Sequence, residues 1–191
     1  KVGELNLSVV GEHNLLNALA AFTAASALSM AEDKLFTGLK SFTGTRRRFE
    51  LKGEVSGIKV IDDYGHHPTE IIATLTAAKN LAQSARVLVI FQPHRYSRTA
   101  AFFEQFSAAL SNADFTFLLE VYAASEKAIP GVSSLMIARN MDQTKVRFEP
   151  SMLEVVSEIT KMAKSGDVII TLGAGDISSL GEPILQSLAS R

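Results

Sequence analysis

Beyond residue 46, short apolar segments alternate with longer amphipathic ones, and this alternation limits the possible folds more than any other feature of the chain. The apolar segments have the length of strands, and those between them repeat apolar residues at helical spacing. Strands are expected at 86–91, 115–120, 145–148 and 167–172, and helices at 68–83, 98–111, 133–140, 152–164 and 176–188. Such alternation forms βαβ units around a buried parallel sheet. The sequence therefore predicts an α/β fold, a doubly wound domain with a mostly parallel sheet over residues 46–191.

Two more strands are expected at the start of this domain, because RRRFELKGEVSGIKVIDDYG places its turn signals at Gly53–Gly57. Residues 1–45 predict a strand at 5–10, a helix capped by Asn14 and a helix at 32–40. The segment SFTGT has linker composition and sets the domain boundary. These elements are too few to bury a core, so a chain that starts in mid-strand is expected to be part of a longer one.

Composition excludes several classes of protein. The chain has 19 Lys+Arg against 20 Asp+Glu, which argues against a general nucleic-acid surface or a polybasic membrane surface. It has no Cys, so disulfides, thiol nucleophiles and Cys-based zinc sites are excluded, and a reducing compartment fits. No apolar run approaches the roughly 20 residues that span a bilayer.

The segment FQPHRYSRT predicts an anion site. Ligands of open parallel sheets bind beyond the carboxyl ends of the strands, where this segment is expected. Its cations His94, Arg95 and Arg98 would face the positive end of a helix dipole, an arrangement that a bound anion would stabilise. The alternative is that the two arginines pair with surface acids. The position of the cluster favours the anion site.

The segment IDDYGHHPTE predicts a second group of polar side chains at the same edge. Asp63 alternates with Asp62 and ends a strand, where a carboxylate can accept hydrogen bonds from ribose hydroxyls. His66 and His67 could bind a metal or could equally cap the following helix, and spacing does not decide between these roles.

One cluster of arginines and one cluster of asparagines each have an ordinary structural explanation when considered alone. In GTRRRFE, Arg46 and Arg48 would share one face of a strand, which is typical of a solvated edge strand. In GEHNLLN, Asn14 would cap a helix, although Asn14 and Asn17 could instead contact a base edge.

The segment LGAGD is a glycine turn before a helix that Asp176 would cap. The full dinucleotide fingerprint and the Walker phosphate loop are absent from the sequence.

Together these motifs resemble the Mur ligases. GEHNLLNALAA, GTRRRFE, VIDDYGHHPTEI, FQPHRYSRT, VYAASE and LGAGDI occur in the order and spacing of that family, over nearly all 191 residues. The first two are shared across the family. YGHHPTE with FQPHRYSRT is specific to the branch that joins L-alanine to UDP-N-acetylmuramate.

The resemblance implies an incomplete ligase. Residues 1–45 would be the C-terminal remnant of a central ATPase domain, and 46–191 the Rossmann-like C-terminal domain. The family reaction uses ATP and Mg²⁺, proceeds through an acyl phosphate and serves cytoplasmic peptidoglycan synthesis. The remaining domains of the protein, with the phosphate loop and the Mg²⁺ ligands, would lie upstream, so this part alone is expected to be inactive.

The resemblance also implies roles for particular residues. His13, Asn14 and Asn17 would contact adenine, Arg47 and Arg48 the phosphates, and Asp63 and Tyr64 the rest of the nucleotide. Tyr64, His66, His94, Arg95 and Arg98 would line the substrate site, with Arg48, His66 and Arg95 catalytic. No metal ligand is expected within the chain.

Three positions depart from the family pattern. Many members have Pro at Val10, Gly at Ser125 and Asp at Ser133, so the role of the 122–134 loop stays open. Two alternatives also stay open: a ligase that recycles murein tripeptide, and a binding module without catalysis.

Overall fold

The computed structural model describes residues 4–9 and 11–191, without the side chains of Glu12 and His13. The chain divides into two compact units, residues 1–46 and 47–191. That the first unit belongs to a central ATP-binding domain stays a prediction.

The first unit is a helical hairpin. Helix α1 (Glu12–Ala27) packs on α2 (Glu32–Ser41) through Phe22 and Phe36, whose ring centroids are 5.5 Å apart. The two expected helices are therefore present.

The expected strand at 5–10 is not confirmed: described residues 4–9 contain no strand, and Val10 lies outside the described part of the chain. A strand needs a neighbour for its backbone hydrogen bonds, and the described residues of this unit contain no other strand. The expectation that Asn14 caps α1 was also wrong. The helix begins earlier, with Gly11 in the capping position and no side-chain cap.

The second unit is built on a six-stranded sheet in the order β1-β2-β6-β3-β4-β5. Its strands are β1 (Glu50–Val55), β2 (Ile58–Asp63), β3 (Val87–Phe91), β4 (Phe115–Leu118), β5 (Val146–Phe148) and β6 (Val168–Leu172). Strand β1 pairs antiparallel with β2, and the remaining pairs are parallel. The predicted α/β fold with a mostly parallel sheet is confirmed.

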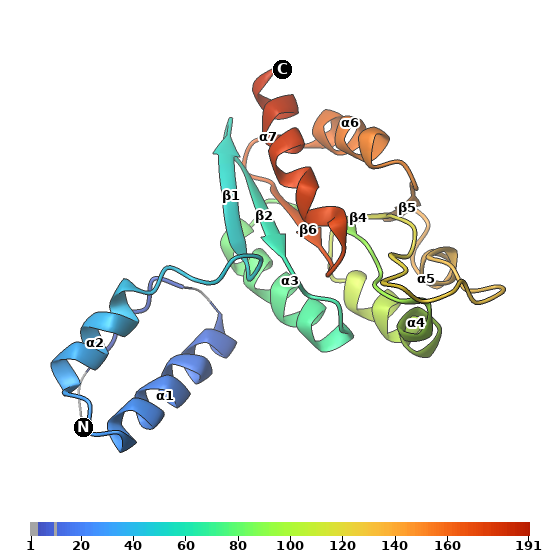
Figure 1. Cartoon of the computed structure of the whole chain (residues 1–191). Helices are drawn as coiled ribbons and strands as arrows, with labels where there is room; N and C mark the ends of the chain where they lie inside the picture. The colour runs from blue at the N-terminus through green and yellow to red at the C-terminus, as the bar shows by residue number, and fades with distance from the viewer. Residues whose placement is uncertain (1–3, 10) are drawn as a thin grey trace. The chain divides into compact units, whose positions relative to one another are not determined.

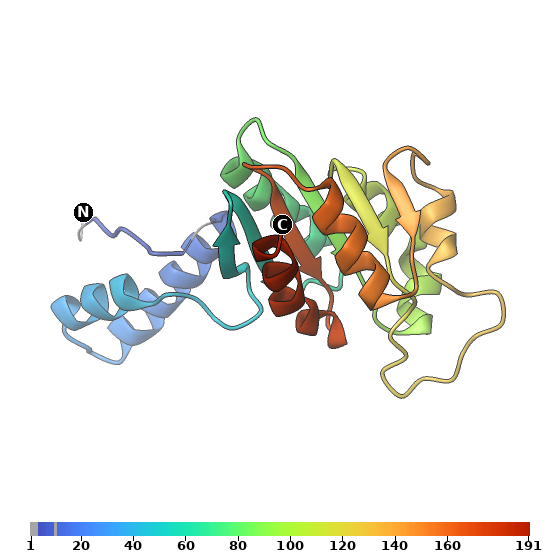
Figure 2. The same cartoon turned by 90° about the horizontal axis from the view of Figure 1, so that it is seen from above.

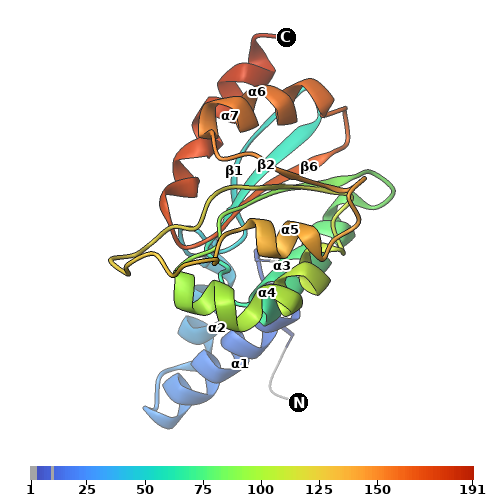
Figure 3. The same ribbon diagram turned by 90° about the vertical axis from the view of Figure 1, so that its right-hand side faces the viewer.

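Helices cover both faces of this sheet (Figures 1 and 3). Helices α3 (Pro68–Ala82), α4 (Tyr96–Leu110) and α5 (Leu135–Arg139) lie on one face. Helix α6 (Met152–Met162), the 3₁₀ helix η1 (Asp176–Leu180) and α7 (Gly181–Ala189) lie on the other. Alternate strand residues serve the two cores, so Val89 faces α3 and α4 while Ile90 faces α6 and α7. This two-sided burial explains the continuous apolar runs in the sequence.

The strand order brings four loops to one edge of the sheet. Because β2, β6, β3 and β4 run parallel, the residues after each of them meet at their shared carboxyl end. These are 64–67, 173–175, 92–95 and 119–134. The last of them projects away from the sheet (Figure 2). The expected meeting of 64–67 and 92–95 at one edge of the sheet is therefore confirmed.

Candidate functional site

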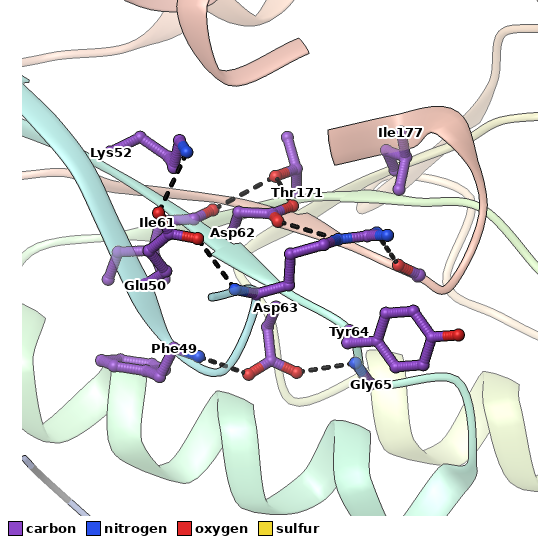
Figure 4. Close-up of polar contacts among 12 residues, drawn as sticks. Phe49, Glu50, Lys52, Ile61, Asp62, Asp63, Tyr64, Gly65, Thr171 and Ile177 are labelled. Atoms are coloured by element: carbon purple, nitrogen blue, oxygen red, sulfur yellow. Dashed lines mark hydrogen bonds and ion pairs between the residues drawn. The ribbon is translucent and has the colours of Figure 1, made fainter. Parts of the chain in front are cut away.

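Asp63 connects two loops through its side chain. One loop precedes β1, and the other follows β2. Its carboxylate accepts hydrogen bonds from Phe49 N and Gly65 N, both at 2.7 Å, and only 6% of the residue is exposed (Figure 4). Burial raises the pKa of Asp63 above its ordinary value, although these two N–H groups act in the opposite direction. The side chain thus has a structural task, and only its remaining lone pairs are open to a ribose.

Arg47 is held at the same edge by the neighbouring carboxylate. Its Nε donates to Asp62 Oδ2 at 3.1 Å, and its Nη2 donates to Gly173 O at 2.6 Å. The other oxygen of Asp62 accepts from Thr171 Oγ1 at 2.7 Å (Figure 4). Asp62 is 1% exposed, so Arg47 neutralises a buried charge.

The three consecutive arginines do not lie on a strand, which corrects the expected pairing of Arg46 with Arg48 on one strand face. Strand β1 begins only at Glu50, and Arg47 and Phe49 have φ angles of 59° and 50°. These turn conformations direct the chain so that Arg47, and not Arg48, enters the sheet edge.

Arg48 is the more accessible arginine of the two. Its side chain is 53% exposed and makes one long ion pair, Nη1 to Glu70 Oε1 at 3.5 Å. Its guanidinium lies 5.7 Å from the Tyr64 ring centroid, and that of Arg47 lies 4.9 Å from the same ring. Arg48 can therefore reach an incoming anion without breaking a buried contact.

Glu70 organises the start of α3. Its Oε2 accepts from His66 N at 2.9 Å and from His67 N at 3.1 Å, while its other oxygen faces Arg48. Burial alone would raise the pKa of Glu70, but these N–H groups, the His66 ring and Arg48 hold it below its ordinary value. The carboxylate is thus ionised and fixes both neighbours.

The two adjacent histidines have different tasks. His67 caps α3: its Nδ1 accepts from Thr69 N at 3.4 Å and completes a capping box with Glu70. The capping explanation therefore holds for His67. The His66 ring instead contacts Tyr64 O through Nδ1 at 3.0 Å and lies 6.0 Å from the His94 ring.

His94 contacts groups from two other loops and from helix α4. Its ring stacks on Tyr122 at 5.6 Å with 15° between the planes, and Arg98 Nη1 lies 3.3 Å from its Nδ1. Burial and then the charges of Arg98, His66 and Arg95 lower the pKa of His94 below its ordinary value. A neutral imidazole is therefore favoured here.

Neither arginine of the expected anion site pairs with an acid. Within the described residues, no carboxylate lies within 4.0 Å of the Arg95 or Arg98 guanidinium. The nearby acid Glu126 instead accepts from Ser97 Oγ at 2.6 Å and Ser97 N at 3.0 Å, which ties the 119–134 loop to the start of α4. The alternative, in which Arg95 and Arg98 pair with surface acids, is therefore wrong for the described residues.

The side chain of Gln92 holds the glycine turn after β6 through two hydrogen bonds. Gln92 Nε2 donates to Asp176 Oδ1 at 2.8 Å, and its Oε1 accepts from Ile177 N at 3.3 Å. A Cβ on Gly175 would lie 2.8 Å from the Tyr122 ring, so only glycine fits there. Asp176 does not cap a helix as expected, because it is itself the first residue of η1.

The adenine-contact residues lie in the first unit. The His13 side chain falls outside the described part of the chain. Asn14 is half-buried and Asn17 is exposed, three residues apart and so on one face of α1. Their expected role stays a prediction.

The described residues lack a metal-binding cluster and a membrane-spanning helix. They contain no group of three or more His, Cys, Asp or Glu side chains that could hold a metal ion. Helices long and apolar enough to cross a bilayer are likewise missing from this part of the chain.

A protein-family model matches the part of the chain that contains these loops. Residues 47–175 match the model described as Mur ligase, glutamate ligase domain. The chain belongs to the Mur ligase family. The match begins at Arg47 and includes all four loops at the carboxyl edge of the sheet, through Gly175. The resemblance inferred from the motifs is confirmed.

Individual relatives show which Mur ligases this chain is similar to. A UDP-N-acetylmuramate–L-alanine ligase of Renibacterium salmoninarum is 47% identical over 97% of this chain and 40% of its own length. The structure of such a ligase from Thermotoga maritima has a TM-score of 0.83 and 31% identity, covering 98% of this chain and 40% of that one. A murein peptide ligase of Psychrobacter arcticus has a TM-score of 0.72 and 27% identity, covering 98% and 39%. The chain thus spans about two-fifths of the length of these relatives.

Several residues of this Mur ligase site were not found by sequence reasoning. Glu70 had a signal, since it stands three residues after the capping His67. Asp62 had none, because its partner is distant in sequence. Tyr122 and Glu126 belong to the motif VYAASE, but no local pattern indicated their contacts with His94 and Ser97.

Proposed function

We propose that this chain is the C-terminal part of an ATP-dependent ligase that joins L-alanine to UDP-N-acetylmuramate for peptidoglycan synthesis. The supporting observation is the cluster at the carboxyl edge of the sheet. It places Arg48, His66, His94, Arg95 and Arg98 on neighbouring loops, with the cations unpaired or only weakly paired by acids. Such a surface suits substrates that carry two carboxylates, a phosphate and an amine, of which only the muramoyl carboxylate is phosphorylated and then attacked by the amine.

Each residue has a task in this proposal. Arg48 moves from Glu70 toward a phosphate when the domains close, because its present ion pair is long and half-exposed. Arg95 and Arg98 hold the carboxylates of the amino acid and the muramoyl group. His66 and Tyr64 line the side of the site next to the nucleotide, and Asp63 offers its remaining lone pairs to the ribose.

ATP would supply the phosphoryl group that activates the sugar carboxylate. The accessible guanidinium of Arg48 fits an incoming phosphate. The described residues do not offer a Mg²⁺ site, so the proposal takes the metal ligands, and the phosphate loop, from another part of the ligase. The adenine contacts of His13, Asn14 and Asn17, and the nucleotide contact of Arg47, are proposals of the same kind. Arg47 would act from its buried ion pair and not as a mobile side chain.

The first test uses the full-length ligase and its Arg95→Ala variant. A lost charged hydrogen bond to a carboxylate lowers kcat/KM for L-alanine or the sugar about tenfold or more. Arg139→Ala is the matched control, since Arg139 is exposed on α5 and has no ion pair within the described residues. Unchanged kcat/KM for both substrates in Arg95→Ala would overturn the assignment.

Two further measurements separate the alternatives. Competition between L-alanine and murein tripeptide on the full-length protein distinguishes the proposed ligase from a tripeptide-recycling enzyme. The 191-residue chain with ATP, Mg²⁺, L-alanine and UDP-N-acetylmuramate is expected to release no phosphate, and turnover by it would contradict the need for another domain.

A further inference from the structure

We propose that His66 and His94 are held in opposite neutral tautomers, so that the site offers one hydrogen-bond acceptor and one donor to an α-amino acid. Their ring centroids lie 6.0 Å apart, close enough for one small molecule to contact both. The choice of an amino acid as the ligand rests on the proposed function. The tautomers themselves rest only on the contacts of the two rings.

The contacts of His66 place its proton on Nδ1. This atom lies 3.0 Å from Tyr64 O and 3.5 Å from Glu70 Oε2. A carbonyl and an ionised carboxylate can only accept hydrogen bonds, so the ring nitrogen between them must donate. In the neutral ring, Nε2 is then the acceptor, and no hydrogen-bond partner for it lies among residues 4–9 and 11–191.

The contacts of His94 place its proton on the other nitrogen. Arg98 Nη1 lies 3.3 Å from His94 Nδ1, and a guanidinium can only donate. Nδ1 must therefore accept, and the neutral ring carries its proton on Nε2. That N–H also has no acceptor within the described part of the chain.

An α-amino acid matches this pair of groups. Its amino group donates hydrogen bonds and suits His66 Nε2, while its carboxylate accepts them and suits His94 Nε2–H. The reversed tautomers would place a donor against the amine and a lone pair against the carboxylate. Tyr64, Glu70 and Arg98 are thus positioning residues, since they set which nitrogen of each ring is free.

His67 provides an internal reference. Thr69 N donates to its Nδ1 at 3.4 Å as the helix cap, and the Thr69 hydroxyl, 2.7 Å from the same atom, can donate to it as well, which assigns the proton to Nε2. The described histidines are therefore expected to divide into one ring protonated on Nδ1, His66, and two protonated on Nε2, His67 and His94.

The tautomers can be read by long-range ¹H–¹⁵N correlation spectra of the 191-residue chain at pH 8, where ordinary histidines are neutral. Nε2 couples to both ring protons and Nδ1 mainly to one, so the spectrum shows which nitrogen is protonated. Single variants His66→Gln, His67→Asn and His94→Gln assign the signals. The expected result is Nδ1–H for His66 and Nε2–H for the other two. His66 and His94 in the same tautomer would overturn the proposal.

A positioning variant tests the cause. Arg98→Met removes the donor to His94 Nδ1, and a population of His94 protonated on Nδ1 is then expected, with His66 and His67 unchanged. An unchanged His94 tautomer would show that Arg98 does not set it. Because neither spectrum needs substrate, both results are independent of whether the ligase reaction is correctly assigned.

Kinetics of the full-length ligase test the ligand. His94→Leu removes the donor and His94→Gln retains an N–H near the same place, so the KM for L-alanine rises about tenfold or more in the first and less in the second. The KM for UDP-N-acetylmuramate is the reference and is expected to change less than the KM for L-alanine. Equal effects of the two variants on L-alanine would contradict the donor role. Absence of any L-alanine product in the unmodified ligase would instead contradict the proposed function.

Discussion

Arg47 forms a 3.1 Å ion pair with the buried carboxylate of Asp62, although the next residue along the chain, Arg48, remains half-exposed. The pair joins the first residue of the second unit to the end of β2, and the same guanidinium also donates to Gly173 O beyond β6. Two neighbouring arginines therefore have separate tasks. Arg47 stabilises the sheet edge, and Arg48 stays accessible to solvent.

This difference predicts unequal losses of stability. Arg47→Ala leaves the Asp62 carboxylate buried without its cation and is expected to lower the free energy of unfolding by about 2–4 kcal/mol. Arg48→Ala breaks only a long surface pair and is expected to change it by at most about 0.5 kcal/mol. Denaturant unfolding followed by far-UV circular dichroism measures both. Equal losses in the two variants would contradict the division of tasks.

His94 predicts a pH dependence of stability. Its pKa is lower in the folded chain than in the unfolded one, because burial and the charges of Arg98, His66 and Arg95 oppose its protonation. The unfolded state therefore binds more protons between the two pKa values, and the free energy of unfolding falls as pH drops below about 6.5 toward the folded value. His94→Gln cannot titrate and should show a shallower fall over this range. Identical slopes in urea unfolding series at several pH values would rule this out.

The contact between Glu126 and Ser97 predicts how the 119–134 loop resists proteolysis. Lys127 is the only Lys or Arg at positions 119–134, so trypsin can cut the loop only after it. Glu126→Ala removes both hydrogen bonds to Ser97 and is expected to speed that cleavage roughly threefold or more. Glu104→Ala, an exposed acid on α4 without a hydrogen bond or ion pair to any described residue, is the control and should leave the rate unchanged. No acceleration in Glu126→Ala would contradict the restraint.

The departure from the family pattern at Ser125 has a backbone explanation. Ser125 has a φ of 71°, a conformation that favours glycine, and many Mur ligases have Gly at this position. Ser125→Gly is therefore expected to raise the free energy of unfolding by about 0.5–1 kcal/mol. Ser133 in the same loop has an ordinary φ, so Ser133→Gly should lower the free energy of unfolding slightly. Thermal unfolding of the two variants compares them, and a loss in both would show that strain at Ser125 is absent.

Sequence periodicity was sufficient for the fold of the second unit. Val89 and Ile90 belong to opposite cores because successive side chains of a strand face opposite ways, and buried strands on both faces read as continuous apolar runs. The same reasoning placed His94, Arg95 and Arg98 at the carboxyl edge of the sheet. It failed for the strand expected at 5–10, because the composition of a segment does not tell whether a partner strand lies beside it.

The tertiary structure alone decided what the polar side chains of the site do. Alternation correctly separated Asp62 from Asp63, but the partner of Asp62 depends on the left-handed turn at Arg47 and on β6 lying beside β2. Tyr122 stacks on His94 because β3 and β4 are neighbours, although 27 residues separate the two rings. Local patterns record which face of an element is buried, since burial repeats with the period of the helix or strand. Contacts between loops depend on strand order, which no local period records.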